Sequence, residues 1–216
     1  KNSDFSNLYT RSVQIKDSYG NIDITSNSFS SPVQKQNYIL EHVVIGSCPN
    51  ADIKINNNHF SNIPYQNADF GISAISGFGL GKSGGSVTVE NNIIDYAGRN
   101  NSGKHRLYAI DFYDDCDNLK ISRNILKNVM WGGIRFNGTS ENVEISGNKI
   151  QVRNPDDTGT ITSSTTQRNK IFKNISIINN EIFSLKPLNI AILLQNQYKD
   201  CCVENVLVEN NTLIDS

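Results

Sequence analysis

Residues 142–150 read Asn-Val-Glu-Ile-Ser-Gly-Asn-Lys-Ile, and residues 21–29 repeat the pattern as Asn-Ile-Asp-Ile-Thr-Ser-Asn-Ser-Phe. The shared motif is apolar, any, apolar, any, any, Asn, any, apolar. It occurs seven times in the 216 residues, and successive motif asparagines are 31, 34, 32, 24, 32 and 31 residues apart. The motif asparagines are Asn27, Asn58, Asn92, Asn124, Asn148, Asn180 and Asn211. A recurrence at this period indicates a repeat architecture.

Each motif describes two short strands joined by a bend. The first two apolar residues alternate with polar ones, so they face one side of a strand. The Asn stands at the bend, because Asn tolerates the left-handed region and its amide can bond nearby backbone. Identical Asn side chains in stacked coils can also bond one another as an amide ladder. With no helical periodicity, the repeat predicts an all-β parallel β-helix, a solenoid of about seven coils that occupies residues 1–216 as a single domain.

The composition agrees with a β-solenoid. The chain has 31 Asn, 23 Ser and 27 Ile, but only 37% hydrophobic and 19% charged residues. β-branched residues favour strands. A net charge of −1 argues against a strongly basic nucleic-acid-binding protein. No apolar run approaches the roughly 18 residues of a membrane-spanning helix.

Two further expectations concern the cysteines and the ends of the sequence. The four cysteines fit neither a disulfide framework nor a metal site, so we expect buried free thiols. They are Cys48, Cys116, Cys201 and Cys202. Neither end of the sequence resembles a capping element, which favours a fragment of a longer β-helix.

A further strand can be placed before most motifs. It starts nine residues ahead of the motif in three coils, at 13–15, 110–112 and 134–136. Related segments lie further upstream at 71–74 and 189–192, and 38–46 has two possible registers. The predicted insertions are 77–85, 98–106 and 195–200, and residues 154–169 are predicted to form a long surface excursion without strand periodicity.

The unit N-[ILV]-x-[IV]-x-x-N-x-[ILF], seen at 21–29 and 142–150, resembles the right-handed parallel β-helix repeat of the pectate-lyase-like superfamily. This superfamily includes polysaccharide lyases, polygalacturonases, alginate epimerases and phage tailspike depolymerases. The resemblance covers nearly the whole chain and implies a right-handed β-helix and a carbohydrate polymer as the ligand. A tailspike-type protein would be found outside the cell or on the virion surface, and it would form a homotrimer.

The resemblance does not extend to the catalytic motifs of these families. The chain lacks the GHG element of polygalacturonases and the RxPxxR element of pectate lyases. Residues 108–113 are similar to the YGFDPH strand of alginate epimerases, with matches at Tyr108 and Asp111. Tyr113 stands in place of the epimerase His, and Arg135 stands where that family has an acidic residue. Because one fold hosts many activities, function must be argued from the site.

The strands at 110–112 and 134–136 place a candidate site on the outer face. If the apolar residues point inward, Asp111 and Arg135 point outward at the same register, one strand spacing apart. They are predicted to form a salt bridge, with Ser73 and Ala191 in the same column of other coils. The alternative interpretation is a surface ion pair that contributes little to stability.

A functional site built on this pair would use nearby aromatic and basic residues. Arg135 could bind a uronate or sialate carboxylate, and tyrosine or histidine side chains could transfer a proton. Trp131 and the tyrosines could stack on sugar rings. The candidate catalytic residues are Asp111, Arg135 and Tyr108. The candidate substrate-binding residues are Tyr113, Trp131, His105, Arg106 and Asn137.

The reaction class stays open at this point. A glycoside hydrolase needs two carboxyl groups about 5–9.5 Å apart, whereas Asp111 and Asp115 would be about 13 Å apart along a strand. A lyase needs only a base and a group that neutralises the uronate, so it fits slightly better. The alternative is a non-catalytic glycan-binding adhesin or structural solenoid. No cofactor is expected, although Asp111, Asp114, Asp115 and Asp117 could bind Ca²⁺ or simply cap turns.

Overall fold

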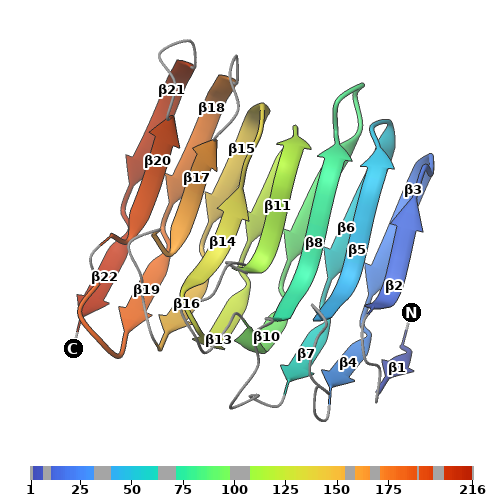
Figure 1. Ribbon diagram of the computed structural model, residues 1–216, viewed down its shortest axis with the longest axis horizontal. Helices are drawn as coiled ribbons and strands as arrows, with labels where there is room; N and C mark the ends of the chain where they lie inside the picture. The colour runs from blue at the N-terminus through green and yellow to red at the C-terminus, as the bar shows by residue number, and fades with distance from the viewer. Residues whose placement is uncertain are drawn as a thin grey trace.

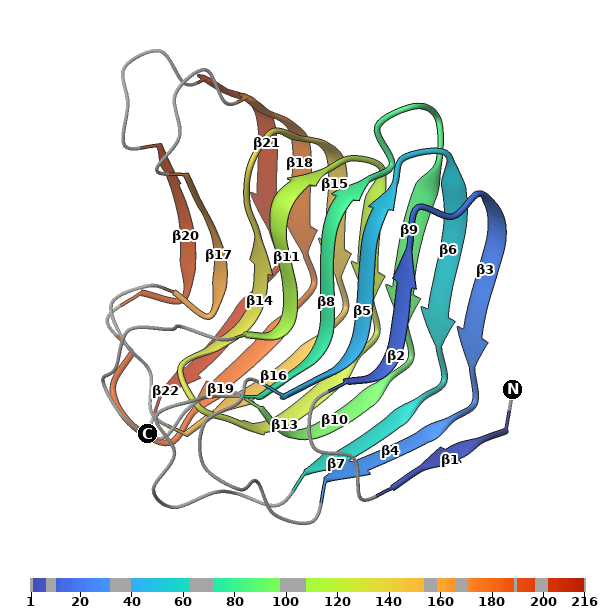
Figure 2. The same ribbon diagram turned by 45° about the vertical axis from the view of Figure 1, so that its right-hand side comes forward.

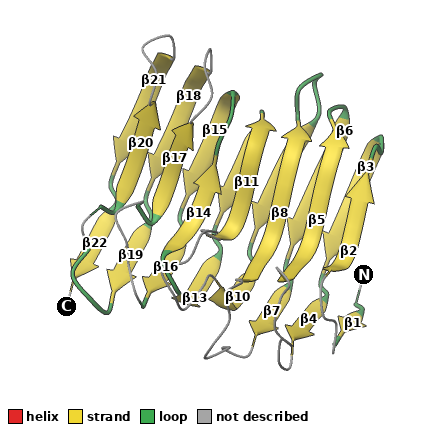
Figure 3. Ribbon diagram, in the orientation of Figure 1, coloured by secondary structure: helices red, strands yellow, loops and turns green. Residues whose placement is uncertain are grey.

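The computed structural model describes residues 2–6, 11–31, 40–62, 72–97, 108–153, 159–165, 171–188, 190–196 and 202–215. These residues form twenty-two strands and no helix (Figure 3). His105 and Arg106, and the predicted insertion at 98–106, lie outside the described residues. Within the described part of the chain, there is no helix of the length and apolarity needed to cross a membrane.

The strands form three parallel sheets that run side by side along the long axis of the molecule (Figures 1 and 2). Sheet A contains β1 (Asp4–Phe5), β4 (Ser28–Ser31), β7 (His59–Asn62), β10 (Ile93–Ala97), β13 (Ile125–Val129), β16 (Lys149–Val152), β19 (Glu181–Ser184) and β22 (Thr212–Asp215). Sheet B contains β2 (Arg11–Lys16), β5 (Leu40–Cys48), β8 (Ile72–Leu80), β11 (Tyr108–Cys116), β14 (Gly132–Phe136), β17 (Ile161–Thr165) and β20 (Ile192–Asn196). Sheet C contains β3 (Gly20–Thr25), β6 (Ala51–Asn56), β9 (Ser86–Glu90), β12 (Leu119–Ser122), β15 (Ser140–Ser146), β18 (Ile171–Ile178) and β21 (Cys202–Glu209).

The chain passes from sheet B to sheet C to sheet A and then returns to sheet B one strand further along. Every strand therefore pairs in parallel with the equivalent strand of the neighbouring coil. The repeat keeps its register, so Leu119 of β12 lies between Val87 of β9 and Val143 of β15. The prediction of an all-β parallel β-solenoid is confirmed.

The apolar residues of the motif form the core. Ile53, Val89, Ile121 and Ile145, from four successive repeats, are fully buried, because each packs against the neighbouring coils. The core is narrow, and each coil covers its neighbours. This arrangement explains why a chain with few apolar residues folds: only one face of each strand needs them.

The predicted amide ladder is present between sheets C and A. Asn124 illustrates one step: its backbone N–H and its side-chain Nδ2 both donate to Oδ1 of Asn148, at 3.0 Å each. Its own Oδ1 accepts the equivalent pair from Asn92, at 3.0 and 2.9 Å. The remaining Nδ2 hydrogen bonds to the Val89 carbonyl at 2.9 Å. The side chain is completely buried, so it has no water to replace these bonds.

The left-handed residue of the bend is not the ladder Asn, as the sequence suggested, but the residue before it. These preceding residues have φ between 53° and 62°. They are Ser26, Asn57, Asn91, Arg123, Gly147, Asn179 and Asn210. Asn and Gly adopt this conformation most readily, which accounts for five of the seven. The bend turns the chain at that residue and leaves the next side chain pointing inward, where the ladder forms.

A second ladder, on the surface, was not predicted. Asn142 donates to Asn118, Asn174 donates to Asn142, and Asn205 donates to Asn174, at 2.9–3.0 Å. All four have φ between 50° and 58°. They occupy the first position of the N-[ILV]-x-[IV] unit, so the signal was present in the sequence as a second aligned Asn.

Three segments predicted to lie outside the strands contain strand residues. Residues 161–165, within the predicted excursion, form β17, and residues 77–80, within a predicted insertion, belong to β8. The first lacks apolar alternation because Ser163 takes a buried position. The second is rich in glycine because the Phe112 ring of the next coil occupies the space beside Gly77, where a Cβ would lie 2.6 Å from it. The third, at 195–200, contains Gln195 and Asn196 of β20, and residues 197–200 lie outside the described residues.

The pairing of β5 with β8 decides between the two strand registers that the sequence allowed for 38–46. Val43 and Ile45 lie opposite Ile75 and Gly77 and face the core.

The cysteine prediction is partly correct. Cys48 and Cys116 are buried free thiols, but Cys202 is an exposed free thiol. Cys201 lies outside the described residues. Cys202 lies in β21, which pairs with β18 on one side and has no strand on its other side among the described residues. Val208 in the same strand is 50% exposed, whereas its register partner Ile177 is fully buried.

The ladder gives a direct stability test. Asn124→Ala removes the buried Oδ1 that accepts from the backbone N–H and Nδ2 of Asn92, and the Nδ2 that donates to Asn148 and to the Val89 carbonyl. We therefore expect a loss of about 3 kcal/mol in the free energy of unfolding. Asn142→Gly is the matched control, because it removes an exposed ladder amide and keeps the left-handed conformation. We expect this control to lose under about 1 kcal/mol in urea unfolding. Equal losses in the two variants would contradict the structural role of the inner ladder.

Candidate functional site

The predicted Asp111–Arg135 pair is present on the outer face of sheet B. The two residues lie opposite each other in β11 and β14. Nε of Arg135 donates to Oδ1 of Asp111, and Nη2 donates to Oδ2, each at 2.6 Å. This is the bidentate geometry in which arginine binds a carboxylate most strongly.

The pair is not the exposed surface ion pair of the alternative interpretation. The side chain of Asp111 is 3% exposed and that of Arg135 is 21% exposed. Burial raises the pKa of the Asp111 carboxyl, while the charge and hydrogen bonds of Arg135 act in the opposite direction. Both carboxylate oxygens of Asp111 are therefore hydrogen-bonded to Arg135, and only the outer part of the guanidinium group is exposed to solvent.

The ring of Tyr108 packs against the guanidinium group of Arg135. The Tyr108 side chain is 3% exposed, and its ring lies 4.9 Å from the guanidinium carbon of Arg135. A guanidinium over an aromatic face is an attractive cation–π contact. The structure thus brings the three candidate catalytic residues together, with Arg135 as the outermost member.

The other two residues predicted to lie in the same column as the pair, Ser73 and Ala191, were wrong. Ser76, not Ser73, lies opposite Asp111, and Thr162 lies opposite Arg135, followed by Leu193 rather than Ala191. The residues aligned with the pair lie three positions later in β8, and two positions later in β20, than the residues chosen from sequence. Thr162 is 1% exposed, and its hydroxyl forms no hydrogen bond with any of the residues that the structure describes.

An aromatic row lies beside the pair, and half of it was missed from sequence. Tyr113 is 41% exposed, and its ring centroid is 5.4 Å from that of Phe78, at a tilt of 33°. Nζ of Lys16 lies 5.7 Å from the Phe78 ring centroid. The Phe78 ring covers Gly46 of the preceding coil, where a Cβ would lie 2.1 Å from the ring, so this position has space for the ring only because it is glycine. Phe78 falls in the glycine-rich stretch predicted as an insertion, which is why it was not considered.

A second ion pair lies three positions before the Asp111 column along the strands, because Glu41 is opposite Ser73 and Asp111 is opposite Ser76. Nη2 of Arg11 lies 3.0 Å from Oε2 of Glu41, whose side chain is 12% exposed. Burial, together with the charges of Glu41 and Asp111, raises the pKa of the Tyr113 phenol to about 12. This phenol therefore stays protonated at neutral pH, and it can donate a hydrogen bond but cannot act as a general base.

Of the remaining predicted substrate-binding residues, two are buried or half-buried and two lie outside the described residues. Trp131 is only 8% exposed and packs with Tyr96 and Met130 in a small cluster of its own, so little of its ring is available to a sugar. Asn137 is half-buried, and its backbone N–H donates to the Phe112 carbonyl at 2.8 Å. His105 and Arg106 lie outside the described residues.

The aspartates near the end of β11 are engaged with the turn after β14. Asp115 accepts a hydrogen bond from the Thr139 backbone N–H at 2.5 Å, and Asp117 accepts one from the backbone N–H of Glu141, in β15, at 2.9 Å. Asp117 also pairs with Lys82 at 3.1 Å. In the described part of the chain, no group of three or more His, Cys, Asp or Glu side chains is arranged to hold a metal ion.

Comparisons of the chain with family models, curated proteins and solved structures return no match. The resemblance to pectate-lyase-like proteins rests on the repeat alone. The functional argument therefore depends on the geometry of the sheet B face: the buried pair Asp111–Arg135 and the aromatic row of Phe78 and Tyr113.

The buried pair gives a prediction with a distinctive pH dependence. Arg135→Met leaves the Asp111 carboxylate buried without its partner, so we expect a loss of about 3 kcal/mol in the free energy of unfolding at about pH 7. Burial raises the pKa of the folded carboxyl above that of the unfolded chain. The folded variant then binds the proton more tightly, and its stability falls as pH rises through the folded pKa.

The loss should consequently be smaller at about pH 5 than at about pH 7 in urea unfolding. The double variant Asp111→Asn, Arg135→Met should recover part of the stability at neutral pH, since no charge is left buried. An identical loss for Arg135→Met at both pH values would show that the carboxylate is not buried as described.

Proposed function

We propose that the protein binds a carbohydrate polymer along the outer face of sheet B. The observation that carries this proposal is the contact between the half-buried Phe78 and the exposed Tyr113, flanked by the cations Lys16 and Arg135. Aromatic rings present an apolar face to the C–H side of a sugar, and the Tyr113 hydroxyl can bond its polar edge. Arg135 offers its solvent-facing N–H groups to a carboxylate or a sulfate.

The shape of the protein supports a polymer over a small molecule. The residues come from successive parallel strands, so they form a continuous rigid surface instead of an enclosed cavity. Side chains fixed on strands keep their spacing, which suits a ligand that repeats along its length. The repeat's resemblance to pectate-lyase-like proteins also supports a carbohydrate ligand. A protein of the tailspike-depolymerase type, in an extracellular or virion-surface location, is the version of this proposal closest to that resemblance.

Cleavage of the bound polymer is the second candidate. It is favoured by the raised pKa of two groups, Asp111 and Tyr113, in one region of the surface, because perturbed acids and bases gather at catalytic sites. A lyase would use Arg135 to neutralise a uronate, Tyr108 or His105 to take the proton beside its carboxyl, and the protonated Tyr113 to protonate the leaving oxygen. The commitment of Asp111 to Arg135 weighs against a hydrolase, which needs two available carboxyl groups.

Binding is tested by titrating a panel of acidic and neutral polysaccharides in a calorimeter. Tyr113→Ala and Phe78→Ala should each weaken binding about tenfold, because each removes a stacking ring. Tyr19→Ala is the matched control, since Tyr19 is 76% exposed on the turn between β2 and β3 and should not affect binding. Retained affinity in both Phe78 and Tyr113 variants would remove the sheet B face from consideration.

The same incubations distinguish a binding protein from an enzyme. A lyase would produce unsaturated uronates with ultraviolet absorbance, and either enzyme would produce new reducing ends. Asp111→Asn and Arg135→Ala should abolish these products if the pair acts in cleavage. Binding without new ends on any polymer would leave the protein as a glycan-binding solenoid.

A further inference from the structure

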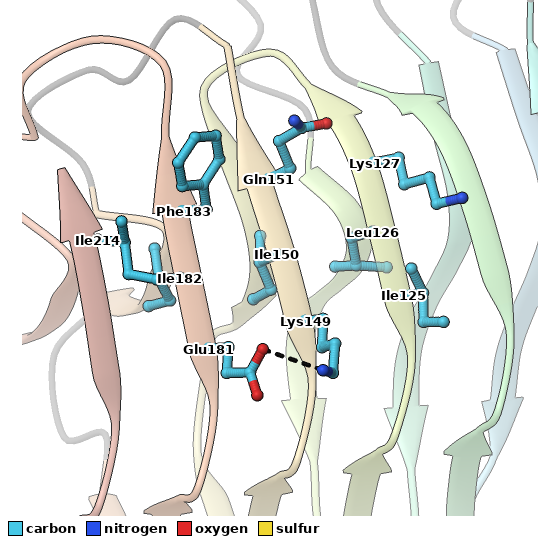
Figure 4. Close-up of a pocket in the computed structure, with 10 residues that line it drawn as sticks. All are labelled: Ile125, Leu126, Lys127, Lys149, Ile150, Gln151, Glu181, Ile182, Phe183 and Ile214. Carbon is cyan, nitrogen blue, oxygen red and sulfur yellow. Dashed lines mark ion pairs between the residues drawn. The ribbon is translucent and has the colours of Figure 1, made fainter. Parts of the chain in front are cut away.

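A hollow lies on a different face of the molecule from the sheet B surface. It has a volume of about 300 Å³ and lies on sheet A, over β13, β16, β19 and β22 (Figure 4). It is separate from the sheet B surface, because its lining residues come only from sheet A. A volume of this size is at the lower end of the range for ligand sites, and it suits a small group or a short segment of a chain.

The strand register explains why a hollow forms there. Leu126, Ile150 and Ile182 lie opposite one another and are buried in the core. The residues on either side of this row point outward, because side chains alternate along a strand. Two rows of outward side chains therefore rise on either side of a floor made by the strands themselves, as Figure 4 shows.

The two walls differ in chemistry. In one wall, Nζ of Lys149 lies 3.1 Å from Oε2 of Glu181, so these charges compensate each other. The other wall runs from Lys127 through Gln151 to Phe183, and Ile214 lies beyond it in β22. Polar groups thus occupy the β13 end of this wall, and an aromatic and an aliphatic side chain occupy the β22 end.

Lys127 is the third charged residue of this hollow, and Figure 4 shows its side chain extending away from Gln151 and Phe183. It is exposed and forms no ion pair within the described residues. Its register neighbour Asp95 instead accepts a hydrogen bond from Nδ2 of Asn128 at 2.8 Å. The flexible four-carbon stem of a lysine lets its ammonium reach a ligand lying along the wall.

Gln151 is oriented for a ligand between these two ends. Its Oε1 faces the Asn128 backbone N–H at 3.4 Å, a long hydrogen bond. This contact turns the Nε2 group of Gln151 away from the backbone, where its two hydrogens can be donated to a hydroxyl.

We propose that this hollow binds one or two sugar units of an acidic carbohydrate, as a second glycan site on the sheet A face. The apolar face of a pyranose ring packs on Phe183 and Ile214, a hydroxyl accepts from Gln151, and a carboxylate or sulfate pairs with Lys127. The strands of Lys127 and Phe183 are two strand spacings apart, about 10 Å, which matches a ligand of that length. The class of ligand rests on the proposed function, but the site and its residues do not.

The test uses short uronic-acid oligosaccharides of two to four units and the ¹⁵N-labelled protein. We expect backbone shifts in β13, β16 and β19, and affinity at these signals about tenfold lower in Phe183→Ala and in Lys127→Gln. Lys54→Gln, which removes the same charge from the exposed face of sheet C, should have no effect. Neutral oligosaccharides of equal length should bind more weakly and be insensitive to Lys127→Gln.

The two proposals fail in different ways. Shifts confined to β8 and β11 and abolished by Tyr113→Ala, with no effect of Phe183→Ala or Lys127→Gln, would overturn the sheet A site and leave the proposed function standing. Shifts in sheet A that persist in Tyr113→Ala would support the sheet A site even if the sheet B surface binds nothing. No shifts in either sheet with any oligosaccharide would overturn both proposals.

Discussion

Each buried ladder asparagine holds its neighbour by two hydrogen bonds to one side-chain oxygen. Oδ1 of Asn148 accepts from both the backbone and the side chain of Asn124, and the same pattern joins Asn58 to Asn92. A carbonyl oxygen has two lone pairs, so a single step satisfies it fully. Because an unpaired amide in the core is costly, every coil must place its Asn at the same height and angle as the last. The register of the whole stack depends on this constraint.

The sheet B surface follows from that register. Asp111 meets Arg135 because their coils are aligned, although the two residues are only 24 positions apart while most coils are longer. The Phe78 ring extends over Gly46 for the same reason. Extra residues of the longer coils fall between the strands, so the sheets keep their spacing whatever the loops contain. The solenoid therefore acts as a scaffold that presents rows of side chains at fixed intervals.

The sequence was informative where the period was strong. The alternation of apolar residues and the recurring Asn predicted sheets C and A and the ladder between them, because a buried amide and a core residue leave a mark in every coil. Sheet B was harder. Its strands begin at variable distances from the motif, so the partner of Asp111 was placed at Ser73 instead of Ser76. A strand with a buried serine, β17, left no apolar pattern to detect.

The low solvent exposure of Asp111 could not be predicted from the sequence either. Alternation correctly indicated that Asp111 leaves the core, but an outward side chain need not be exposed, and this one is nearly covered. The aromatic partner Phe78 was hidden among glycines whose purpose, space for a ring from another coil, appears only in three dimensions. Residues that depend on packing between coils of unequal length cannot be ranked from one-dimensional spacing.

The most direct test of the account is hydrogen exchange of asparagine side-chain amides, followed by nuclear magnetic resonance. The inner ladder predicts slow exchange and amide-to-amide contacts between neighbours for Asn58, Asn92, Asn124 and Asn148, which are buried. The exposed Asn142 and Asn174 of the surface ladder should exchange much faster. Equally fast exchange in both sets would contradict a buried ladder and, with it, the register that assembles the proposed site.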